Sequence, residues 1–512
     1  MMIVFNKGVN KMYVEGRMTV ERANDYIQEN REKVNPRYRP AFHVAPPVGW
    51  MNDPNGFIYY QGEYHLFYQF YPYNSQWGPM HWGHAKSKDL IHWEELPVAL
   101  APDEWYDKDG CFSGSAIEKD GRLYLMYTGH VVENDVVTQT QCIAVSDDGI
   151  TFEKLASNPV IGVELLGDEG SIHDCRDPKV IQHDGRYYSV LATKTPDNRG
   201  KILLFASDDL IQWSFFSVLL EGTATQGVMW ECPDLFHLDG KDVLIMSPIQ
   251  IQRDAHEYHN TSSTMAWIGE MDWESGTFLV ENSHEMDYGM DYYAPQTLLD
   301  EQGRRILIAW MQMWERTYPT HELGHNWTGE MCLPRELSIN HNRLVQLPVS
   351  EIYDYLTDQQ VVENIEVIKE PVSFPDVVTE NVYLKIVADL SQAQKLTMAF
   401  AKKEHQSLFM TYDKETALFS FSRENFGYAI TGIEKEQVHT REFPVALIHD
   451  QLTIEIFRDT NAIEIFVNGQ ETSTSTFYEI EASSELVFES QGKALITSFK
   501  SAQVNTACER KR

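Results

Sequence analysis

One short pattern, a turn glycine followed by an apolar strand, recurs five times and limits the fold more than any other feature of the sequence. The segments read QGEYHLFYQF, DGRLYLMYTG, DGRYYSVLAT, DGKDVLIMSP and QGRRILIAWM, and their glycines are Gly62, Gly121, Gly185, Gly240 and Gly303. The spacing of 55 to 64 residues is too long for one hairpin and suits a unit of four short strands. Five such units predict a β-propeller.

A second repeat lies between the glycine turns. SKDLIHWEEL at Ser87, SDDGITFEKL at Ser146 and SDDLIQWSFF at Ser207 each read as a turn that leads into an outer strand with an aromatic residue. Aromatic residues make up 12% of the chain, and most apolar runs are short and alternating, which favours strands. We expect an all-β protein with a five-bladed propeller over residues 41–345.

The period stops after the propeller, which indicates further units. Residues 346–512 begin with a proline-containing linker and continue with strand-like runs such as VYLKIVADL and LTIEIFRDT. A turn at Asp459, Thr460 and Asn461 predicts a hairpin, and the whole segment predicts a C-terminal β-sandwich. Residues 1–40 are expected to form an N-terminal extension in which Thr19 caps a short helix over residues 20–33. Residues 1–17 look dispensable, with Met18 as an alternative start.

The charge balance excludes several classes of partner. Lys and Arg number 42 against 76 Asp and Glu, a net charge of −34, which would repel nucleic acid and anionic membranes. No stretch approaches the roughly 20 apolar residues of a spanning helix. Six cysteines without a disulfide pattern and an N-terminus without a secretory apolar region favour the cytoplasm. The oligomeric state is left open.

Acidic residues recur where the inner strands of the predicted propeller begin. The strand before each turn glycine should line the axis, and it opens with WMNDPNG, CRDP and WECPDLF in the first, third and fourth units. Asp53, Asp177 and Glu231 therefore lie eight or nine residues before a turn glycine, and we expect them at one repeat position. The second and fifth units have Ser113 and Ala294 there.

Carboxylates that converge at the mouth of a channel repel one another, so at least one should have a raised pKa and hold its proton near neutrality. An ionised carboxylate beside a protonated one is what a glycoside hydrolase needs. The alternative is that each acid caps a turn and binds backbone amides. It explains a single Asp beside a proline well, but it explains three in register poorly.

The blocks WMNDPNG, FSGS, RDP and EC, in this order and spacing, resemble the signatures of family 32 glycoside hydrolases, which include invertases, sucrose-6-phosphate hydrolases and fructanases. The resemblance covers the propeller and, more loosely, the sandwich. It implies that Asp53 is the nucleophile, Glu231 the general acid and base, and Asp177 a stabiliser of the transition state. The implied reaction is retaining hydrolysis of a terminal β-D-fructofuranoside through a covalent fructosyl enzyme, with no metal and no organic cofactor.

The same resemblance implies a fructose pocket, in which two tryptophans offer apolar faces to the sugar rings. Its residues would be Trp50, Asn52, Gln69, Trp77, Phe112, Ser113, Arg176 and Trp310. Most of these have a structural alternative, because tryptophans in propellers pack between blades and Gln69 can cap the sheet at the end of its strand. Cys232, beside Glu231, either lowers the local polarity or only packs.

The segment His321-Glu322-Leu323-Gly324-His325 matches the HExxH pattern of zinc proteases. That pattern brings both histidines to one face only on a helix. Pro319 before it and Gly324 within it predict a loop instead. We therefore expect no metal site here, but a loop at the channel mouth where His321 or His325 touches the leaving sugar.

Other functions stay open at this point. A fructan exo-hydrolase or a fructosyltransferase would use the same three acids with a differently shaped leaving-group site, and a non-catalytic sugar-binding propeller is less favoured because all three acids are present. A small imported substrate, sucrose or sucrose 6-phosphate, is expected. Whether a phosphate is bound is undecided, and the cations available in the predicted blade loops are Arg253, His256 and Arg316.

Overall fold

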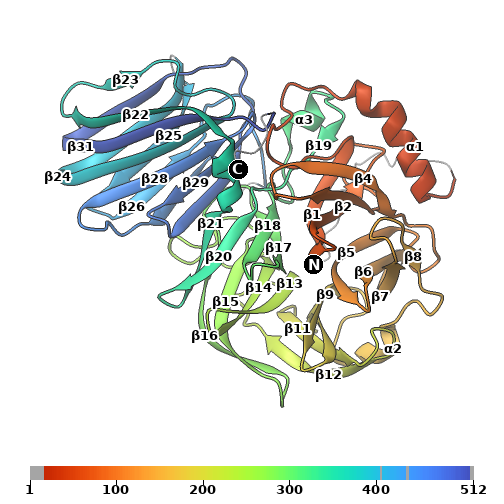
Figure 1. Cartoon of the computed structure of the whole chain (residues 1–512). Helices are drawn as coiled ribbons and strands as arrows, with labels where there is room; N and C mark the ends of the chain where they lie inside the picture. The colour runs from red at the N-terminus through yellow and green to blue at the C-terminus, as the bar shows by residue number, and fades with distance from the viewer. Residues whose placement is uncertain (1–15, 404–405, 434–437, 508–512) are drawn as a thin grey trace.

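Five antiparallel sheets surround one axis in the first two thirds of the chain (Figure 1). The computed structural model describes residues 16–403, 406–433 and 438–507. The blades are formed, in chain order, by β1 (Gly49–Tyr60), β2 (Glu63–Tyr71), β3 (His81–Ser87) and β4 (Trp93–Leu100); β5 (Gly110–Lys119), β6 (Arg122–Glu133), β7 (Val136–Ser146) and β8 (Glu153–Lys154); β9 (Arg176–His183), β10 (Arg186–Lys194), β11 (Gly200–Ser207) and β12 (Trp213–Glu221); β13 (Met229–Leu238), β14 (Lys241–Ile249), β15 (Met265–Asp272) and β16 (Thr277–Glu285); and β17 (Tyr293–Leu299), β18 (Arg305–Trp310), β20 (Arg335–Asn340) and β21 (Arg343–Pro348).

The first strand of each blade lies innermost, as the repeat predicts. β1 contacts β5, and the contacts continue through β9, β13 and β17 and back to β1. The ring is reinforced by β19 (Trp327–Thr328), which comes from the last blade and pairs in parallel with the start of β1. The propeller is therefore closed, and the inner strands begin around one axial opening.

The recurring glycines close the hairpins between the first two strands of each blade. All five have φ between 77° and 86°, and in the first four turns the residue before the glycine also has a positive φ. That is the type I′ geometry, whose twist matches that of the flanking strands. The fifth turn is longer, and Asp300 caps it by accepting hydrogen bonds from the backbone N–H groups of Gln302 (3.0 Å) and Arg304 (2.8 Å).

Helices are few and short. α1 (Val20–Asn30) continues into the 3-10 turn η1 (Arg31–Lys33) and packs against β4 with Ala23 and Ile27 buried. Thr19 Oγ1 accepts a hydrogen bond of 3.2 Å from the N–H of Arg22, as expected of the predicted cap. α2 (Val163–Leu166) and α3 (Pro319–Glu322) are single turns. Residues 1–15 of the predicted extension lie outside the described residues.

Nothing in the described residues forms a helix that is both long and apolar enough to cross a membrane.

A β-sandwich follows the 3-10 turn η2 (Ser350–Tyr355), so the predicted fold class of a five-bladed propeller and a C-terminal sandwich is confirmed. The long strand β24 pairs with β28 along its first half and with β25 along its second, and β31 runs beside both halves, so these two strands belong to both layers. The Asp459–Asn461 turn joins β28 to β29. The strands are β22 (Leu356–Val367), β23 (Val372–Phe374), β24 (Val382–Lys403), β25 (Gln406–Asp413), β26 (Leu418–Ser422), β27 (Thr440–Pro444), β28 (Gln451–Arg458), β29 (Ala462–Val467), β30 (Glu471–Thr476) and β31 (Leu486–Val504).

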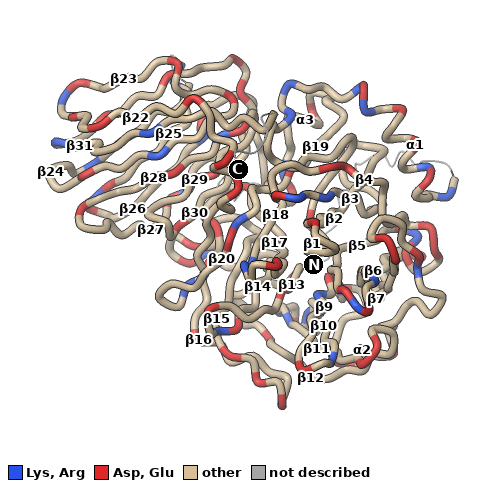
Figure 2. The backbone as a smooth tube through the Cα atoms, in the orientation of Figure 1, with Lys and Arg blue, Asp and Glu red and all other residues tan. Residues whose placement is uncertain are grey.

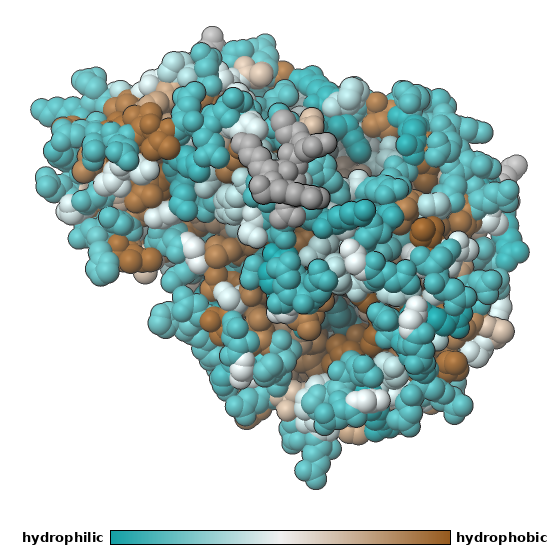
Figure 3. Space-filling model, viewed as in Figure 1, coloured by the Kyte–Doolittle hydropathy of each residue, from teal (hydrophilic) through white to brown (hydrophobic). Residues whose placement is uncertain are grey.

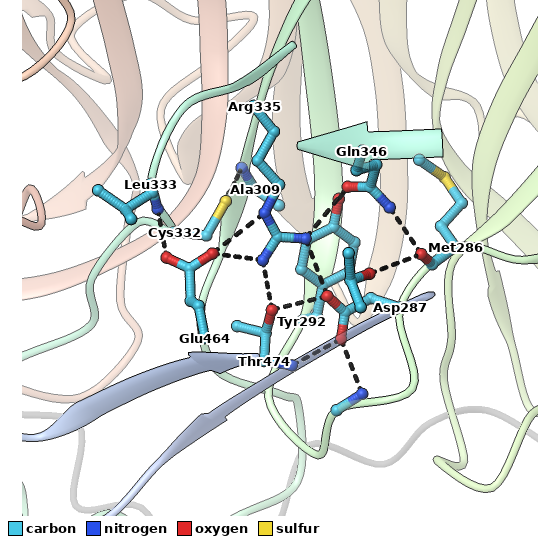
Figure 4. Close-up of polar contacts among 12 residues, drawn as sticks. Met286, Asp287, Tyr292, Ala309, Cys332, Leu333, Arg335, Gln346, Glu464 and Thr474 are labelled. Carbon is cyan, nitrogen blue, oxygen red and sulfur yellow. Dashed lines mark hydrogen bonds and ion pairs between the residues drawn. The ribbon is translucent and has the colours of Figure 1, made fainter. Parts of the chain in front are cut away.

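Buried charges join the sandwich to the last blade (Figure 4). Arg335 on β20 donates to Asp287 at 2.9 Å and, across the domain contact, to Glu464 on β29 at 2.5 Å and to Thr474 on β30. The Arg335, Asp287 and Glu464 side chains are all fully buried. Because each charge has an opposite partner within the contact, the two domain surfaces are complementary in charge.

His43, just before the first blade, makes a second polar contact with the sandwich. Its Nδ1 and Nε2 lie 2.8 Å from carboxylate oxygens of Asp459 and Glu464. Burial disfavours a charged imidazole, but the hydrogen bonds and charges of the two carboxylates outweigh it and raise the pKa of His43 to about 10. His43 is therefore charged at neutral pH and completes the ionic contact between the domains.

Acidic residues are spread over the blades and the sandwich alike (Figure 2), and the face seen in Figure 3 is largely hydrophilic. The net charge of −34 is thus not confined to one domain. Repulsion of polyanions, inferred from the composition, applies to both domains.

Candidate active site

A β-bulge interrupts each inner strand close to the axial opening. In β9 the pairing with β10 skips between Arg176 and Lys179, and in β13 the pairing with β14 skips between Glu231 and Asp234. Comparable breaks occur in β1, β5 and β17. A bulge adds an unpaired residue and bends the strand, which re-aims the side chains around it. The five bulges therefore place the predicted motifs at one end of the axis.

The bulges also correct the predicted register of Glu231. In blades three, four and five the first bulge residue has a positive φ, of 65° at Asp177, 49° at Cys232 and 51° at Ala294. Cys232, not Glu231, is thus the counterpart of Asp177, and Glu231 corresponds to Arg176. Counting back from the turn glycine hid this shift, because β1 has a second bulge that adds one residue between Asp53 and its glycine.

The corrected register explains the surroundings of Glu231. Its counterparts in the neighbouring blades are Arg176 and Tyr293, and both contact it. Arg176 Nε and Nη2 lie 2.9 and 2.8 Å from Glu231 Oε1, while the Tyr293 hydroxyl donates to Oε2 at 2.7 Å. Both oxygens of the carboxylate are thus oriented by side chains from adjacent inner strands. The sequence analysis missed Tyr293, although its place beside Ala294 in the fifth repeat was the available signal.

Asp53 and Asp177 meet around Cys232. The Cys232 thiol lies 3.5 Å from Asp53 Oδ2 and 3.7 Å from Asp177 Oδ2, and the Cys232 N–H donates to the latter oxygen at 3.0 Å. Asp53 also accepts hydrogen bonds from Ser113 at 2.7 Å and from the Asn52 amide at 3.0 Å. The charge of Glu231 acts on both aspartates, so all three predicted acids lie close together.

Burial and mutual repulsion perturb the two aspartates. Burial raises the pKa of Asp53, hydrogen bonds from Ser113 and Asn52 oppose this, and the charge of Glu231 raises it further. Burial also raises the pKa of Asp177 to about 7, against the lowering effect of Arg176 and with additional raising by Glu231 and Asp53. The site therefore holds a proton near neutrality, as expected for converging carboxylates.

The predicted aromatic residues belong to one packed cluster, which also contains Cys232 and Tyr293. Trp310 is fully buried, with Trp50 at 5.8 Å and Trp314 at 4.9 Å between ring centroids. Trp314, which the sequence analysis did not select, is only partly buried and stacks on Trp50 at 6.2 Å with an angle of 25°. Trp310 is thus the fully buried tryptophan of this cluster, and Trp314 packs on it and reaches the surface.

The other predicted sugar contacts lie on β2, β5 and the loop after β2. Trp77 meets Phe112 edge to face, with ring centroids 5.9 Å apart, and Phe112 in turn stacks on His130 at 4.0 Å. Gln69 is buried and donates to the carbonyl of Cys111 at 3.0 Å, so it links the first two blades. Each of these residues therefore has a packing or bonding role of its own.

The HExxH segment does not form the helix that a zinc site requires. α3 ends at Glu322, and Gly324 has a positive φ of 68°. His321 Nδ1 lies 2.8 Å from Ser75 Oγ, whereas His325 stacks on Tyr38 at 5.3 Å. Among residues 16–403, 406–433 and 438–507, no group of three or more His, Cys, Asp or Glu side chains is arranged to hold a metal ion.

Comparisons with known proteins agree over nearly the whole chain. The family model "Glycosyl hydrolases family 32 N-terminal domain" matches residues 43–348, and "Glycosyl hydrolases family 32 C terminal" matches residues 351–506. The sucrose-6-phosphate hydrolase of Bacillus subtilis is 36% identical over 89% of this chain and 92% of its own length. The raffinose invertase of Escherichia coli is 35% identical over 92% and 97%.

Solved structures agree as well. A family 32 β-fructofuranosidase of Bombyx mori has a TM-score of 0.81 and 34% identity, covering 95% of this chain and 98% of its own. The sucrose-6-phosphate hydrolase of Lactobacillus gasseri has a TM-score of 0.84 and 29% identity, with coverages of 95% and 97%. The chain therefore belongs to glycosyl hydrolase family 32.

Proposed function

We propose that this protein is a retaining β-fructofuranosidase that hydrolyses sucrose or sucrose 6-phosphate. The observation that carries the proposal is the contact of Asp53 and Asp177 with one residue, Cys232, which directly follows Glu231. Because the charge of Glu231 also acts on both aspartates, three acids from three blades lie close together at one end of the axis. A single buried carboxylate would be compatible with a structural role, but three around one space are the arrangement of a glycosidase.

In this proposal Asp53 is the nucleophile. Its carboxylate attacks C2 of the fructosyl unit while the bond from C2 to the leaving oxygen breaks, and Glu231 gives its proton to that oxygen. In the second half-reaction Glu231 takes a proton from water, the water oxygen bonds to C2, and the Asp53 ester bond breaks. Hydrogen bonds from Ser113 and Asn52 favour the ionised form of Asp53 that the first step needs.

Asp177 is proposed to stabilise the positive charge that develops at C2 and the ring oxygen. Hydrogen bonds from Arg176 and Tyr293 fix the orientation of the Glu231 carboxyl group. When Glu231 is protonated, its proton is therefore directed to one position. The fructose pocket is proposed to consist of these groups together with Trp50, Asn52, Gln69, Trp77, Phe112 and Ser113, over the supporting Trp310.

The similar proteins support the substrate class. The relatives named above include a sucrose-6-phosphate hydrolase and a raffinose invertase, and the Bombyx mori enzyme has also been solved as a variant in complex with sucrose. The choice between free and phosphorylated sucrose rests on the loops around the opening. The Arg316 side chain is fully buried and bonded to Asp291 at 2.9 Å. Of the three loop cations considered, Arg253 and His256 therefore remain for a phosphate group.

The test is to measure the turnover of sucrose, sucrose 6-phosphate and inulin by the purified protein. We expect hydrolysis of one or both small sugars, with release of fructose of retained configuration followed by NMR. Inulin as the best substrate would favour the alternative of a fructan exo-hydrolase. Binding without turnover of any of the three would leave a sugar-binding propeller and overturn the enzymatic proposal.

A cytoplasmic location is proposed with the same function. The five cysteines in the described residues are free and buried, and free thiols in this number fit a reducing compartment. Fractionation of the source cells with detection of the protein would check this, and recovery outside the cell would contradict it.

Replacing Tyr293 by Phe should lower kcat about 10- to 100-fold and change KM little. The variant loses a hydrogen bond of 2.7 Å to Glu231, and hydrogen bonds to charged groups contribute about 1.5 to 3 kcal/mol. Tyr292→Phe is the matched control, because Tyr292 is equally buried but bonds to Gln346 at the domain contact. Wild-type kcat in Tyr293→Phe would show that the hydroxyl does not orient Glu231.

Replacing Asp177 by Asn should change how stability depends on pH. Asp177 has an ordinary pKa of 3.8 and a folded pKa of about 7, so the folded state binds more protons between these values. The stability contribution of Asp177 is full below pH 4 and is lost as pH rises to 7. The asparagine has no such loss, so Tm of the variant relative to wild type should rise between pH 5 and 8.

The upper bound of this gain is about 3 kcal/mol, because the folded pKa of about 7 lies two units above pH 5 and each unit corresponds to about 1.4 kcal/mol. Thermal unfolding at several pH values measures it. A difference in Tm that stays constant from pH 5 to 8 would show that Asp177 ionises normally in the folded protein.

A further inference from the structure

A second layer of polar side chains crosses the propeller axis just beyond the acids. Lys179, Asp234 and Gln296 are the first paired residues after the bulges of β9, β13 and β17, opposite Val190, Ile245 and Ile308 respectively. Lys179 and Asp234 are only 8% and 1% exposed. These three residues therefore share one level of the axis, and Lys179 and Asp234 follow Asp177 and Glu231 by two and three residues along the chain.

The charged pair in this layer joins three inner strands. Lys179 Nζ on β9 donates to Asp234 Oδ2 on β13 at 2.9 Å and to the Thr297 carbonyl on β17 at 2.7 Å. The same oxygen of Asp234 accepts from the Thr297 N–H at 2.7 Å and from its hydroxyl at 3.0 Å. The spacing of these strands is thus fixed by four short contacts, three of which end on one carboxylate oxygen of Asp234.

Gln296 connects the remaining two inner strands. Its Oε1 accepts from the N–H of Phe57 on β1 at 2.8 Å, and its Nε2 donates to the carbonyl of Gly114 on β5 at 2.9 Å. Together with Lys179 and Asp234, it links all five inner strands at one level. We call these residues, with Thr297, the axial clamp.

Stability alone gives a poor account of a buried ion pair at this place. Removing two charges from water costs several kcal/mol per ion, and well-packed apolar residues often serve as well or better. Retaining glycosidases, by contrast, need their two acting carboxyls about 5 to 5.5 Å apart. Misplacement by about 1 Å can cost 100-fold in rate. Since bulges interrupt the strand pairing next to the acids, contacts across the axis are what can hold this spacing.

We propose that the axial clamp sets the spacing between the strands that carry Asp53, Asp177 and Glu231, and that Lys179, Asp234 and Gln296 are positioning residues. The inference rests on the proposed function, because it concerns the geometry of that reaction. None of the three needs to touch the sugar. Their effect reaches it through the inner strands.

Kinetics on sucrose, or on whichever of the three tested sugars is hydrolysed best, tests the clamp. Lys179→Met leaves Asp234 buried without its charged partner, so it should lose stability as well as activity. The double variant Lys179→Met with Asp234→Leu leaves no unpaired charge and should recover most of the lost Tm. We expect kcat in the double variant to remain at least about 10-fold below wild type, with KM within about two-fold.

Lys201→Met is the matched control in the same blade, because Lys201 is 7% exposed and pairs with Glu169 at 2.7 Å away from the clamp. It should change Tm but leave kcat unaltered. Gln296→Leu, which removes two links without touching a charge, gives a further reading and should lower kcat in the same way.

A double variant with kcat within two-fold of wild type would overturn the inference, and so would a Gln296→Leu variant with unchanged kcat if the double variant does not fold. Failure of the proposed function would look different, because the wild-type protein itself would then hydrolyse none of the three sugars.

Discussion

Asp53→Asn should lose at least about 10⁴-fold in kcat on sucrose, the largest effect expected of any single substitution in this chain. Without the carboxylate no bond to C2 can form, and the two-step route is closed. Removal of a nucleophile in a hydrolase that uses a covalent intermediate commonly costs this much or more. The fold should be unaffected, because asparagine can still accept from Ser113 and occupies the same volume.

The readout is steady-state turnover together with intact mass under rapid quench, where the wild-type protein should carry one fructosyl unit and the variant none. Asp53→Ala repeats the test without the risk of deamidation to Asp. Asp300→Asn is the control, since Asp300 is a buried acid of the fifth blade that bonds to Arg304 at 2.8 Å and lies outside the proposed pocket. More than about 1% residual kcat in both Asp53 variants would remove Asp53 from the nucleophile's role.

The fold was predictable because its signals are local. An Asp-Gly pair at the end of an apolar strand specifies a type I′ hairpin through backbone sterics alone, and Gly121, Gly185 and Gly240 each follow an aspartate with a positive φ. Four such hairpins and a fifth glycine turn at the same spacing leave few architectures. The fifth turn departs from the pattern because Asp300 supplies by side-chain capping what the other turns obtain from backbone conformation.

The register of the strands at the site was harder to predict, because residue propensities do not show where a bulge inserts a residue. Counting from the turn glycines placed Glu231 with Asp177, and only the pairing of β13 with β14 shows that Cys232 holds that position. The same shift brings Tyr293 to Glu231. Contacts of this kind join residues about 60 positions apart through blade packing, so a single sequence does not report them.

The domain contact was likewise beyond sequence pattern. Asp287, Arg335 and Glu464 stand in unrelated repeats and read as ordinary charged positions, yet all three are buried together. Charged residues are usually exposed to solvent. This expectation is wrong where two domains bury oppositely charged side chains between them.

Arg335→Met should destabilise the folded protein by about 3 to 5 kcal/mol, the range measured when one partner of a buried ionic group is removed. The variant leaves Asp287 and Glu464 charged and buried without the guanidinium that contacts both, at 2.9 and 2.5 Å. Arg343→Met is the matched control at the same contact. Arg343 is 35% exposed in its side chain and lies 3.4 Å from Glu471, and half-exposed pairs of this kind contribute about 1 kcal/mol or less.

Urea titration followed by tryptophan fluorescence measures both variants. Adding Asp287→Asn to Arg335→Met should recover part of the loss, because Asp287 loses the ion pair that Arg335 supplies, whereas Glu464 keeps its contact with His43. Equal stability of the Arg335 and Arg343 variants would mean that the buried ion pairs of Arg335 contribute no more to stability than the partly exposed pair of Arg343. If the expected difference is found, the sandwich contributes to the stability of the propeller although it does not carry the acids. It neutralises charges that the propeller buries at its last blade, next to the segment whose strand β19 pairs with the start of β1. A propeller expressed without the sandwich would then expose Arg335 and Asp287 and lose this support beside the strand that carries Asp53.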